Sequence, residues 1–503
     1  RFPVSMMRNA NVSWSERDII QSRATAPAFY KAPYPENLPN GMKVMDFQLA
    51  GAEYLLGRDH GLLGDAPGLT KSAQSVLVSN AIEAERNLVV CPASLRLNWE
   101  REIWAWSTTE NVKTYPVLKS SDGINPFSDY NIISYDLLRS DGIMDAIMDL
   151  RWDHVILDEA HYLKDPNGNL RTKNICAPNR LPSVTGRFTL ASGTILPNQP
   201  IECYNACRLL DWDCIDRMSL NSFRDYYYGE GEGMVRGPYE TTDKETGETI
   251  KKVGLHFSST VRNKPRRLRE LQKRLRGNIM VRRLREQVLH ELPPRHWHPV
   301  PLALTGAMRK AMQHPGWAKA DKLYELDEGR FNLSVEIDGE VSTARRELGE
   351  AKAPAIVGYV EDLLRSGISK LVIGAWHHSV LDYLRDKLTK YGLVYMDGST
   401  SPNAKQQAVD DFQGLPHVAI ILGQMLPLGE GWTLTAAQDM VLAEPYWVPG
   451  KNDQLLDRIS RMGQKGEYTI GHIPVVPNSL DERVLGSAIV KDGHIYQALD
   501  AQD

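Results

Sequence analysis

The sequence is poor in several features that would each assign it to a class of proteins. It has five cysteines in 503 residues, and none shows the paired spacing of a structural zinc site. Cys203 and Cys207 lie four residues apart, but no second Cys or His pair follows them, so we expect free thiols in a reducing compartment. The chain has no run of 18 apolar residues, which excludes a transmembrane helix.

An excess of one charge is also missing. The formal net charge is -4 at pH 7, so the chain as a whole carries no electrostatic sign of nucleic-acid binding. We find no short-period repeats and no low-complexity tracts. The first residues lack the apolar core of a signal peptide. Since the sequence begins with Arg1 rather than Met, we expect that an upstream segment has been removed.

Short apolar runs alternate with helical stretches in two blocks of the chain. The first block has strand-like runs at residues 88–90, 131–133, 155–157 and 188–190, and the second at residues 371–373, 393–395, 418–421 and 440–442. This alternation predicts an α/β fold with parallel sheets covered by helices on both faces. Ligands of such sheets bind at the carboxyl ends of the strands.

A pair of carboxylates follows the third run of the first block. Asp158 and Glu159, in the segment Asp-Glu-Ala-His, come directly after Val155-Ile156-Leu157. Phosphoryl transfer uses such a pair, with one carboxylate on Mg²⁺ and one that positions or activates water. Two acids after a strand are more often a solvated turn, so the pair needs a second motif to support it.

That second motif lies about 90 residues upstream, where residues 61–72 read GLLGDAPGLTKS and resemble the phosphate loop G-x-x-x-x-G-K-[ST]. Lys71 would reach the β- and γ-phosphates, and the Ser72 hydroxyl would bind Mg²⁺. A helix beginning after Ser72 would favour an anion at its N-terminus. The alternative interpretation of this segment is an ordinary strand–turn–helix without a phosphate site. The presence of Asp158 and Glu159 argues against that alternative.

The loop departs from the pattern at two positions. Asp65 stands where the first glycine belongs, and Thr70 where the last one belongs. A β-branched residue restricts the backbone and adds bulk where the phosphates approach. Thr70 therefore predicts weakened nucleotide binding or slow hydrolysis.

With both motifs in place, the chain resembles superfamily-two helicases and, more closely, the SWI/SNF-type ATPases with their annealing-helicase branch. The resemblance covers roughly residues 39 to 490. Segments similar to the family's motifs Q, Ia, Ib, II, III, IV, V and VI follow in the family's order, at residues 47–51, 90–99, 132–138, 158–161, 191–198, 370–376, 428–434 and 454–464. A further block at residues 396–400 lacks the arginine often expected shortly after it.

The resemblance implies a fold and a set of site residues. The fold would be α/β, with two RecA-like parallel-sheet lobes and a helical insertion between them. The residues implied to hold ATP are Gln48, Asp65, Ala66, Pro67, Gly68, Leu69, Thr70, Lys71, Ser72, Gly431 and Gln454. The catalytic residues would be Lys71, Asp158, Glu159, Arg458 and Arg461, with Ser72 and Asp158 on Mg²⁺ and the two arginines as arginine fingers. The residues implied to bind DNA are Arg96, Ser134, Tyr135, Arg266, Arg267, Arg269, Trp376 and Ser399.

One local stretch is strongly basic. Residues 262–285 carry 11 Lys or Arg and one acid, while Leu268, Leu271, Leu275 and Ile279 fall on one helical face. We expect this helix to dock by its leucine face and to turn its basic face outward, where it could neutralise phosphates. The alternative is a solvated basic helix without a specific partner.

The domain organisation follows from these motifs. We expect an N-terminal extension at 1–38, a first lobe at 39–215, a helical protrusion and bridge at 216–345, a second lobe at 346–490 and a tail at 491–503. Within the insertion, residues 229–233 and 241–252 look like an exposed loop or hairpin, and a small strand pair is expected at 331–341.

We therefore expect an ATP- and Mg²⁺-dependent motor that translocates on double-stranded or branched DNA as a monomer, without a membrane, in replication, repair or recombination. It would lie in the cytoplasm of a bacterium or phage-infected host, or in the nucleus of a eukaryote. Two alternatives stay open. One is a DNA-binding relic of such a motor, which Thr70 favours. The other is a strand-separating helicase, whose wedge hairpin the sequence does not show clearly.

Overall fold

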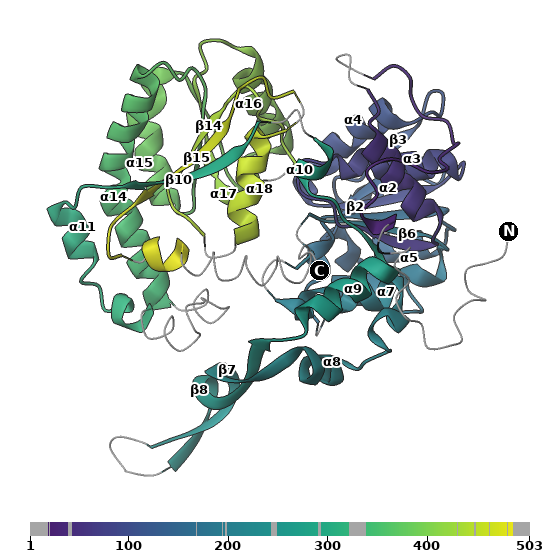
Figure 1. The fold of residues 1–503 in the computed structure, drawn as a ribbon, viewed down its shortest axis with the longest axis horizontal. Helices are drawn as coiled ribbons and strands as arrows, with labels where there is room; N and C mark the ends of the chain where they lie inside the picture. The colour runs from purple at the N-terminus through teal and green to yellow at the C-terminus, as the bar shows by residue number, and fades with distance from the viewer. Residues whose placement is uncertain are drawn as a thin grey trace. The chain divides into compact units, whose positions relative to one another are not determined.

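The chain forms two compact units and includes a long antiparallel ribbon (Figure 1). The computed structural model describes residues 19, 21–38, 43–166, 168–193, 195–196, 199–242, 249–289, 293–320, 339–429, 431–446, 449–461, 463–479 and 481–485, with the backbone alone at 230–264 and 449–450. Described residues up to 223 and those at 268–289 form the first lobe. The second unit contains the described residues within 224–267, which include the ribbon, and the second lobe from residue 293 onward.

The first lobe is built on a parallel sheet of seven strands in the order β3-β4-β2-β5-β6-β1-β9. Its strands are β1 (His60–Leu63), β2 (Asn87–Cys91), β3 (Thr114–Pro116), β4 (Tyr130–Ser134), β5 (His154–Asp158), β6 (Phe188–Ala191) and β9 (Met280–Val281). The central strands are buried along almost their whole length, as expected for a parallel sheet covered on both faces. All four strand-like runs of the first block are therefore strands.

Helices surround this sheet. They are α2 (Asp46–Leu56), α3 (Lys71–Ala81), α4 (Arg96–Trp106), α5 (Asp141–Met148), α6 (Leu170–Cys176), α7 (Tyr204–Leu210), α9 (Leu268–Asn278) and α10 (Arg285–Val288). One core cluster joins α3 and α4 to β2, β4 and β5, with Trp99, Ile103 and Trp106 at its centre. A second cluster joins α2 to α3 and to β1, β6 and β9. Both clusters include residues of α3, and the second includes Leu63 of β1, so they fix the two elements that flank the loop between β1 and α3.

The leucine face predicted for the basic stretch is buried, but most of its arginines are not on the outside. Helix α9 packs on the first lobe through Leu268, Leu271 and Leu275. The interior also holds five arginines of the stretch, which corrects the expected outward basic face, namely Arg274, Arg276, Arg282, Arg283 and Arg285. Each can be buried because an arginine that finds enough carbonyl or carboxylate acceptors no longer needs water.

Between the two chain segments of the first lobe, the chain forms a long two-stranded antiparallel ribbon of β7 (Tyr228–Thr242) and β8 (Thr249–Pro265). Helix α8 (Leu220–Tyr227) leads into it, and the Arg266 amide donates to the Tyr227 carbonyl at its base, at 2.8 Å. The insertion thus contains helices, as expected, but its centre is the hairpin indicated by residues 229–233 and 241–252. The strand pair expected at 331–341 lies mostly outside the described residues, and Val341 belongs to a helix.

The second lobe has a parallel sheet of six strands in the order β10-β15-β14-β11-β13-β12. The strands are β10 (Arg295–Pro301), β11 (Leu371–Ala375), β12 (Leu393–Met396), β13 (Ile420–Gln424), β14 (Asp439–Leu442) and β15 (Thr469–Val475). Its helices are α11 (Gly306–Ala311), α14 (Gly339–Arg365), α15 (His378–Leu388), α16 (Pro402–Gly414), α17 (Met425–Leu428) and α18 (Pro449–Ile459). The predicted α/β class with two parallel-sheet lobes is confirmed.

Local sequence explains several boundaries of the second lobe. Ser401 caps α16 by accepting from the Ala404 amide at 3.3 Å, and Pro402 occupies the first turn, where its missing N–H costs no hydrogen bond. Gly392 ends the turn before β12 with φ 71°, a conformation that favours glycine. Within the part of the chain that the structure describes, no helix combines the length and the apolar character needed to cross a bilayer.

Candidate functional site

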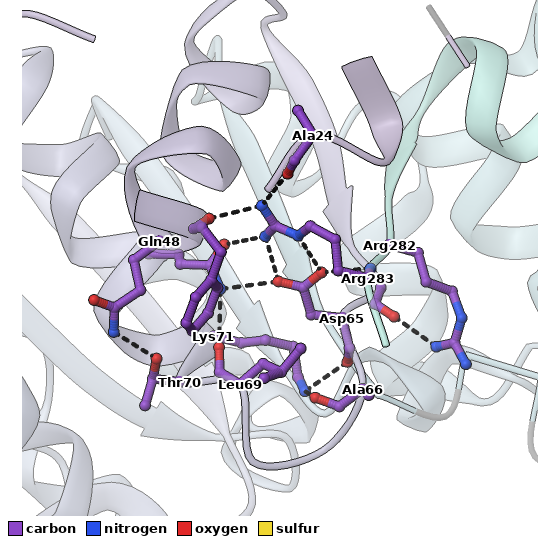
Figure 2. Close-up of polar contacts among 12 residues, drawn as sticks. Ala24, Gln48, Asp65, Ala66, Leu69, Thr70, Lys71, Arg282 and Arg283 are labelled. Atoms are coloured by element: carbon purple, nitrogen blue, oxygen red, sulfur yellow. Dashed lines mark hydrogen bonds and ion pairs between the residues drawn. The ribbon is translucent and has the colours of Figure 1, made fainter. Parts of the chain in front are cut away.

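The phosphate-loop residues form a tight turn between β1 and α3 at the carboxyl edge of the first sheet (Figure 2). Gly68, at a position where the pattern accepts any residue, has φ 86°, a conformation that glycine adopts readily. The ammonium of Lys71 donates to the carbonyl oxygens of Asp65 at 2.9 Å and Ala66 at 3.3 Å. Lys71 is therefore directed back over its own loop, where a phosphate would lie.

Thr70 adopts a left-handed backbone conformation, which glycine enters more readily than threonine. Its φ and ψ are 40° and 54°, in the left-handed region, at the residue that precedes α3. The Thr70 hydroxyl accepts a hydrogen bond of 2.7 Å from the side-chain amide of Gln48. The same Gln48 side chain accepts from the Met45 amide at 2.8 Å and is fully buried. The hydrogen bond from Gln48 thus holds Thr70 in place while its backbone is left-handed.

The other departure, Asp65, has its own partner. Its carboxylate is fully buried and forms an ion pair with Arg283, which lies two residues after β9. Gln74 of α3 donates to the same carboxylate at 2.9 Å. Burial alone would raise the pKa of Asp65, but the charge and hydrogen bonds of Arg283 and Gln74 outweigh it and leave the pKa below its usual value. Asp65 is therefore a charged structural anchor of the loop.

The carboxylate pair lies at the end of β5, two strands away from the phosphate loop. One oxygen of Asp158 accepts from the Trp99 indole at 2.8 Å, and the other from the Glu159 amide at 2.9 Å. The Tyr135 hydroxyl donates to the Asp158 carbonyl at 2.7 Å. These contacts fix the direction of the Asp158 carboxylate, since each of its oxygens has a defined donor.

The electrostatics of this edge suit a divalent cation. Burial, followed by the neighbouring Glu159 carboxylate, raises the pKa of Asp158 to about 7, although Trp99 and Lys71 oppose the rise. Mg²⁺ is held in proteins by one or two carboxylates, waters and substrate phosphates, so few protein ligands are needed. Ser72 and Asp158 supply oxygen donors of the right kind. The described residues contain no cluster of three or more His, Cys, Asp or Glu that could hold a metal.

The Glu159 carboxylate lies beside the imidazole of His161, at a distance of 3.1 Å, and the Glu159 backbone has φ 50°. His161 in turn lies 3.4 Å from the hydroxyl of Ser192, just beyond β6. Segments predicted as motifs II and III are therefore in direct contact in the first lobe.

In the second lobe the structure brings together residues of the predicted motifs V and VI. The Arg461 guanidinium donates to the Gly431 carbonyl at 3.1 Å and to the Thr433 hydroxyl at 3.4 Å. Arg458, on α18, is buried, and its carbonyl accepts from the Leu434 amide at 2.8 Å. Gln454 is buried on the same helix. These residues form one cluster within the second lobe.

The residues predicted to bind DNA fall into two groups. Arg266, Arg267, Arg269 and Ser399 are exposed, and Trp376 is partly buried in a stack with Tyr446 whose ring centroids are 4.5 Å apart. The other three, Arg96, Ser134 and Tyr135, are buried. The Arg96 guanidinium donates to the carbonyls of Val117 at 2.6 Å and Leu118 at 3.0 Å. Arg96, Ser134 and Tyr135 are thus parts of the fold and not available to a DNA backbone in this structure.

Sequence reasoning assigned no role to two residues of α4 that support the predicted metal ligands. Trp99 holds Asp158, as described above. Glu102, one turn further, forms a hydrogen bond with the Ser72 hydroxyl, and its burial raises the pKa of its carboxyl group. The i, i+3 spacing on a helix places both on one face. Trp99 ends the segment predicted as motif Ia, so its position was visible in the sequence. Its partner Asp158 is 59 residues away, and no nearby residue indicates that pairing.

Comparison with known families assigns the chain. The model of the SNF2-related domain matches residues 47–346, more than half of the sequence. The chain belongs to the SNF2-related family. The expected resemblance to SWI/SNF-type ATPases is therefore confirmed, and the match begins at the segment that contains Gln48.

Curated relatives extend this similarity across both lobes of the SNF2-related chain. It is 28% identical to the SWI/SNF-related matrix-associated actin-dependent regulator of chromatin subfamily A-like protein 1 of Xenopus tropicalis, over 92% of this chain and 47% of that protein. It is 25% identical to the human DNA annealing helicase and endonuclease ZRANB3, over 88% of this chain and 39% of that protein. An uncharacterized ATP-dependent helicase of Mycoplasma pneumoniae is 24% identical over 91% of this chain and 43% of that protein.

The chain spans about half or less of the length of these curated relatives. Among solved structures, the SWI2/SNF2 ATPase core of Sulfolobus solfataricus in complex with double-stranded DNA aligns over 95% of this chain and 98% of that chain, at 17% identity and a TM-score of 0.39. The fold described above rests on the strand order and pairing of each lobe, independently of that alignment.

Proposed function

We propose that this SNF2-related chain is a DNA-dependent ATPase that translocates on double-stranded or branched DNA. The observation that carries the proposal is the strand order of the first sheet, in which only β6 separates β1 from β5. Two strand spacings are about 10 Å, so the phosphate loop and the Asp158-Glu159 pair share one edge at a separation that suits a nucleotide triphosphate and its metal.

In this proposal the first lobe binds the triphosphate. Lys71 exchanges its two loop carbonyls for oxygens of the β- and γ-phosphates, and the N-terminus of α3 stabilises their charge. Ser72 and Asp158 hold Mg²⁺, which neutralises charge on the transferring phosphate when it is bound. Glu159 orients the attacking water, and His161 keeps its carboxylate in place.

The second lobe contributes the cations that complete the site. We propose Arg458 and Arg461 as arginine fingers, which act only when the lobes close on nucleotide and DNA. The exposed cations Arg266, Arg267 and Arg269, at the base of the ribbon and the start of α9, are proposed to contact DNA phosphates. The process served would be replication, repair or recombination, in the cytoplasm or nucleus.

The test is ATP hydrolysis by the full chain without DNA, with single-stranded DNA and with duplex DNA. We expect duplex DNA to stimulate hydrolysis most, and Lys71→Ala to abolish it. Lys119→Ala is the matched control, since Lys119 is an exposed lysine of the same lobe and its variant should behave as the parent. Stimulated hydrolysis that survives in Lys71→Ala would refute the assignment of the loop.

A second candidate function, strand separation at forks, is favoured by the β7–β8 ribbon. Its strands have 15 and 17 residues and form a sheet of their own, the kind of projecting hairpin that a wedge requires. A variant in which an Asn-Gly turn replaces residues 231–261 would close the hairpin at the Glu230–Arg262 pair. If the ribbon separates strands, this variant loses fork unwinding but keeps ATP hydrolysis stimulated by linear duplex DNA.

A further inference from the structure

Arg283 is bonded through its whole guanidinium beside the phosphate loop, and no step of the proposed reaction uses it. It lies just after β9, in the segment that leaves the first lobe, and it is fully buried. Its Nε donates to Asp65 Oδ1 at 2.9 Å, and one terminal nitrogen donates to the carbonyls of Phe47 at 2.7 Å and Ala24 at 3.1 Å. The other donates to Asp65 Oδ2 and to Gln74 at 2.8 Å. All five N–H groups of the guanidinium are thereby used.

The partners of Arg283 hold the phosphate loop at both ends (Figure 2). Asp65 is at the start of the loop. Gln74 binds Asp65 and also donates to the carbonyl of Leu69, near the end of the loop, at 2.9 Å. Because one guanidinium contacts both Asp65 and Gln74, it fixes the distance between the start of the loop and the first turn of α3.

The backbone around Arg283 runs alongside the loop as well. The Gly64 amide donates to the Val281 carbonyl at 2.8 Å, and the Ala66 amide donates to the Arg283 carbonyl at 3.0 Å. In the reverse direction, the Arg283 amide donates to Asp65 Oδ1 at 2.9 Å. Residues 281–283, which we call the exit segment, are therefore hydrogen-bonded along the first half of the loop, at residues 64–66.

A neighbouring helix leaves room for this arrangement. A Cβ on Gly51 of α2 would lie 1.8 Å from the Gln74 side-chain oxygen and 2.6 Å from an Arg283 nitrogen. Only glycine fits at position 51 while the network keeps its place. Arg282, the adjacent residue, donates to the carbonyls of Gly64 at 2.6 Å and Gly193 at 3.3 Å, so the same segment also contacts the end of β6.

We propose that Arg283 is a positioning residue for nucleotide binding, which presets the phosphate loop through Asp65 and Gln74. In this chain the ion pair between Asp65 and Arg283 fixes the start of the loop, and the exit segment, residues 281–283, becomes part of the nucleotide site. The inference rests on the proposed function for the identity of its ligand. By linkage, nucleotide binding must in turn stabilise the exit segment.

The test compares Arg283→Lys with Arg274→Lys in the full chain. Lysine keeps the charge but offers three donors in place of five and no planar fork. Arg274 is the matched control, because it is also a buried arginine of the first lobe, paired with Glu270 and Asp216 at 2.7 Å each, and none of these residues belongs to the loop. Two readouts are needed: amide hydrogen exchange of residues 64–74 without nucleotide, and the Kd for Mg²⁺·ADP at a temperature where both variants are folded.

We expect Arg283→Lys to speed exchange across residues 64–74 and to raise the Kd about tenfold or more, the usual effect of removing an outer partner of a ligand-holding group. Arg274→Lys should change neither. Equal effects of the two variants, or no change in loop exchange for Arg283→Lys, would overturn the proposal.

Two further outcomes are distinguishable. If Arg283→Lys does not fold, Asp65→Asn, which keeps size and shape, replaces it with the same expected effects on exchange and Kd. If the parent protein binds no nucleotide, the proposed function fails, while the exchange of residues 64–74 still decides whether Arg283 positions the loop.

Discussion

Replacement of Thr70 by glycine and by alanine tests whether the loop is strained as the structure indicates. At φ 40° Thr70 lies in the left-handed region, which costs an L-residue with a Cβ about 1–2 kcal/mol. The hydrogen bond from Gln48 to its hydroxyl, at 2.7 Å, offsets about 0.5–1.5 kcal/mol of this. Glycine would remove the strain and the hydrogen bond together. It would also lower the stability of the folded state by about 0.4–1 kcal/mol, because glycine raises the entropy of the unfolded chain.

These contributions nearly cancel for glycine, so Thr70→Gly should stay within about 1 kcal/mol of the parent in chemical denaturation. Alanine keeps the left-handed strain and loses the bond, so Thr70→Ala should be destabilised by about 0.5–1.5 kcal/mol. The smaller residue thus gives the more stable protein. In nucleotide binding, Thr70→Gly should match or exceed the parent, because it opens the approach to the phosphates.

A double-mutant cycle with Gln48→Ala isolates the hydrogen bond. We expect a coupling energy of about 0.5–1.5 kcal/mol between Gln48→Ala and Thr70→Ala. If Thr70→Ala is as stable as the parent while Thr70→Gly is strongly destabilised, Thr70 is not in the left-handed region and the reasoning fails. If neither variant alters nucleotide binding, Thr70 does not limit the loop.

Three further predictions concern other parts of the fold. Trp99→Phe removes the indole donor to Asp158, so we expect hydrolysis to fall about tenfold and to need more Mg²⁺, and a Mg²⁺ titration that matches the parent would contradict this. Burial, with a smaller effect of nearby charge, lowers the pKa of His154 to about 3, so the unfolded chain binds more protons between pH 6.5 and 3. Stability should therefore fall on acidification through this window, by up to about 1.4 kcal/mol per pH unit, and His154→Gln should flatten the slope in denaturation series at several pH values. Lys352→Met leaves the buried Asp481 without its ion-pair partner and should destabilise the second lobe by about 3–5 kcal/mol in denaturation experiments, whereas an effect below about 1 kcal/mol would mean that the pair is solvated.

The sheets could be predicted from sequence because their signal is local. Each strand-like run is a short apolar segment bounded by polar or turn-forming residues. Because these strands are buried on both faces, such runs can be recognised without tertiary information. The position of Asp158 at the carboxyl end of β5 follows from the same pattern. The leucine face of α9 was predictable for a related reason, since its 3.6-residue period needs no knowledge of its partner.

The buried arginines could not be predicted, because their partners are remote in the chain. Arg283 pairs with Asp65 across 218 positions, and nothing near either residue marks the other. A stretch rich in arginine has the same composition whether its side chains are exposed to water or buried against carbonyl oxygens. Only the three-dimensional supply of acceptors separates exposed Arg269 from buried Arg276.

The two departures from the phosphate-loop pattern argue for a loop that is still maintained in a nucleotide-binding shape. Asp65 and Thr70 each replace a glycine, and each has a dedicated partner outside the loop, Arg283 for one and Gln48 for the other. Gly51 leaves space for the first of these networks. A relic without a ligand has no need to compensate two separate substitutions by buried side chains with specific hydrogen-bond partners. The compensation therefore favours a working ATP site with altered loop chemistry over an inactive one.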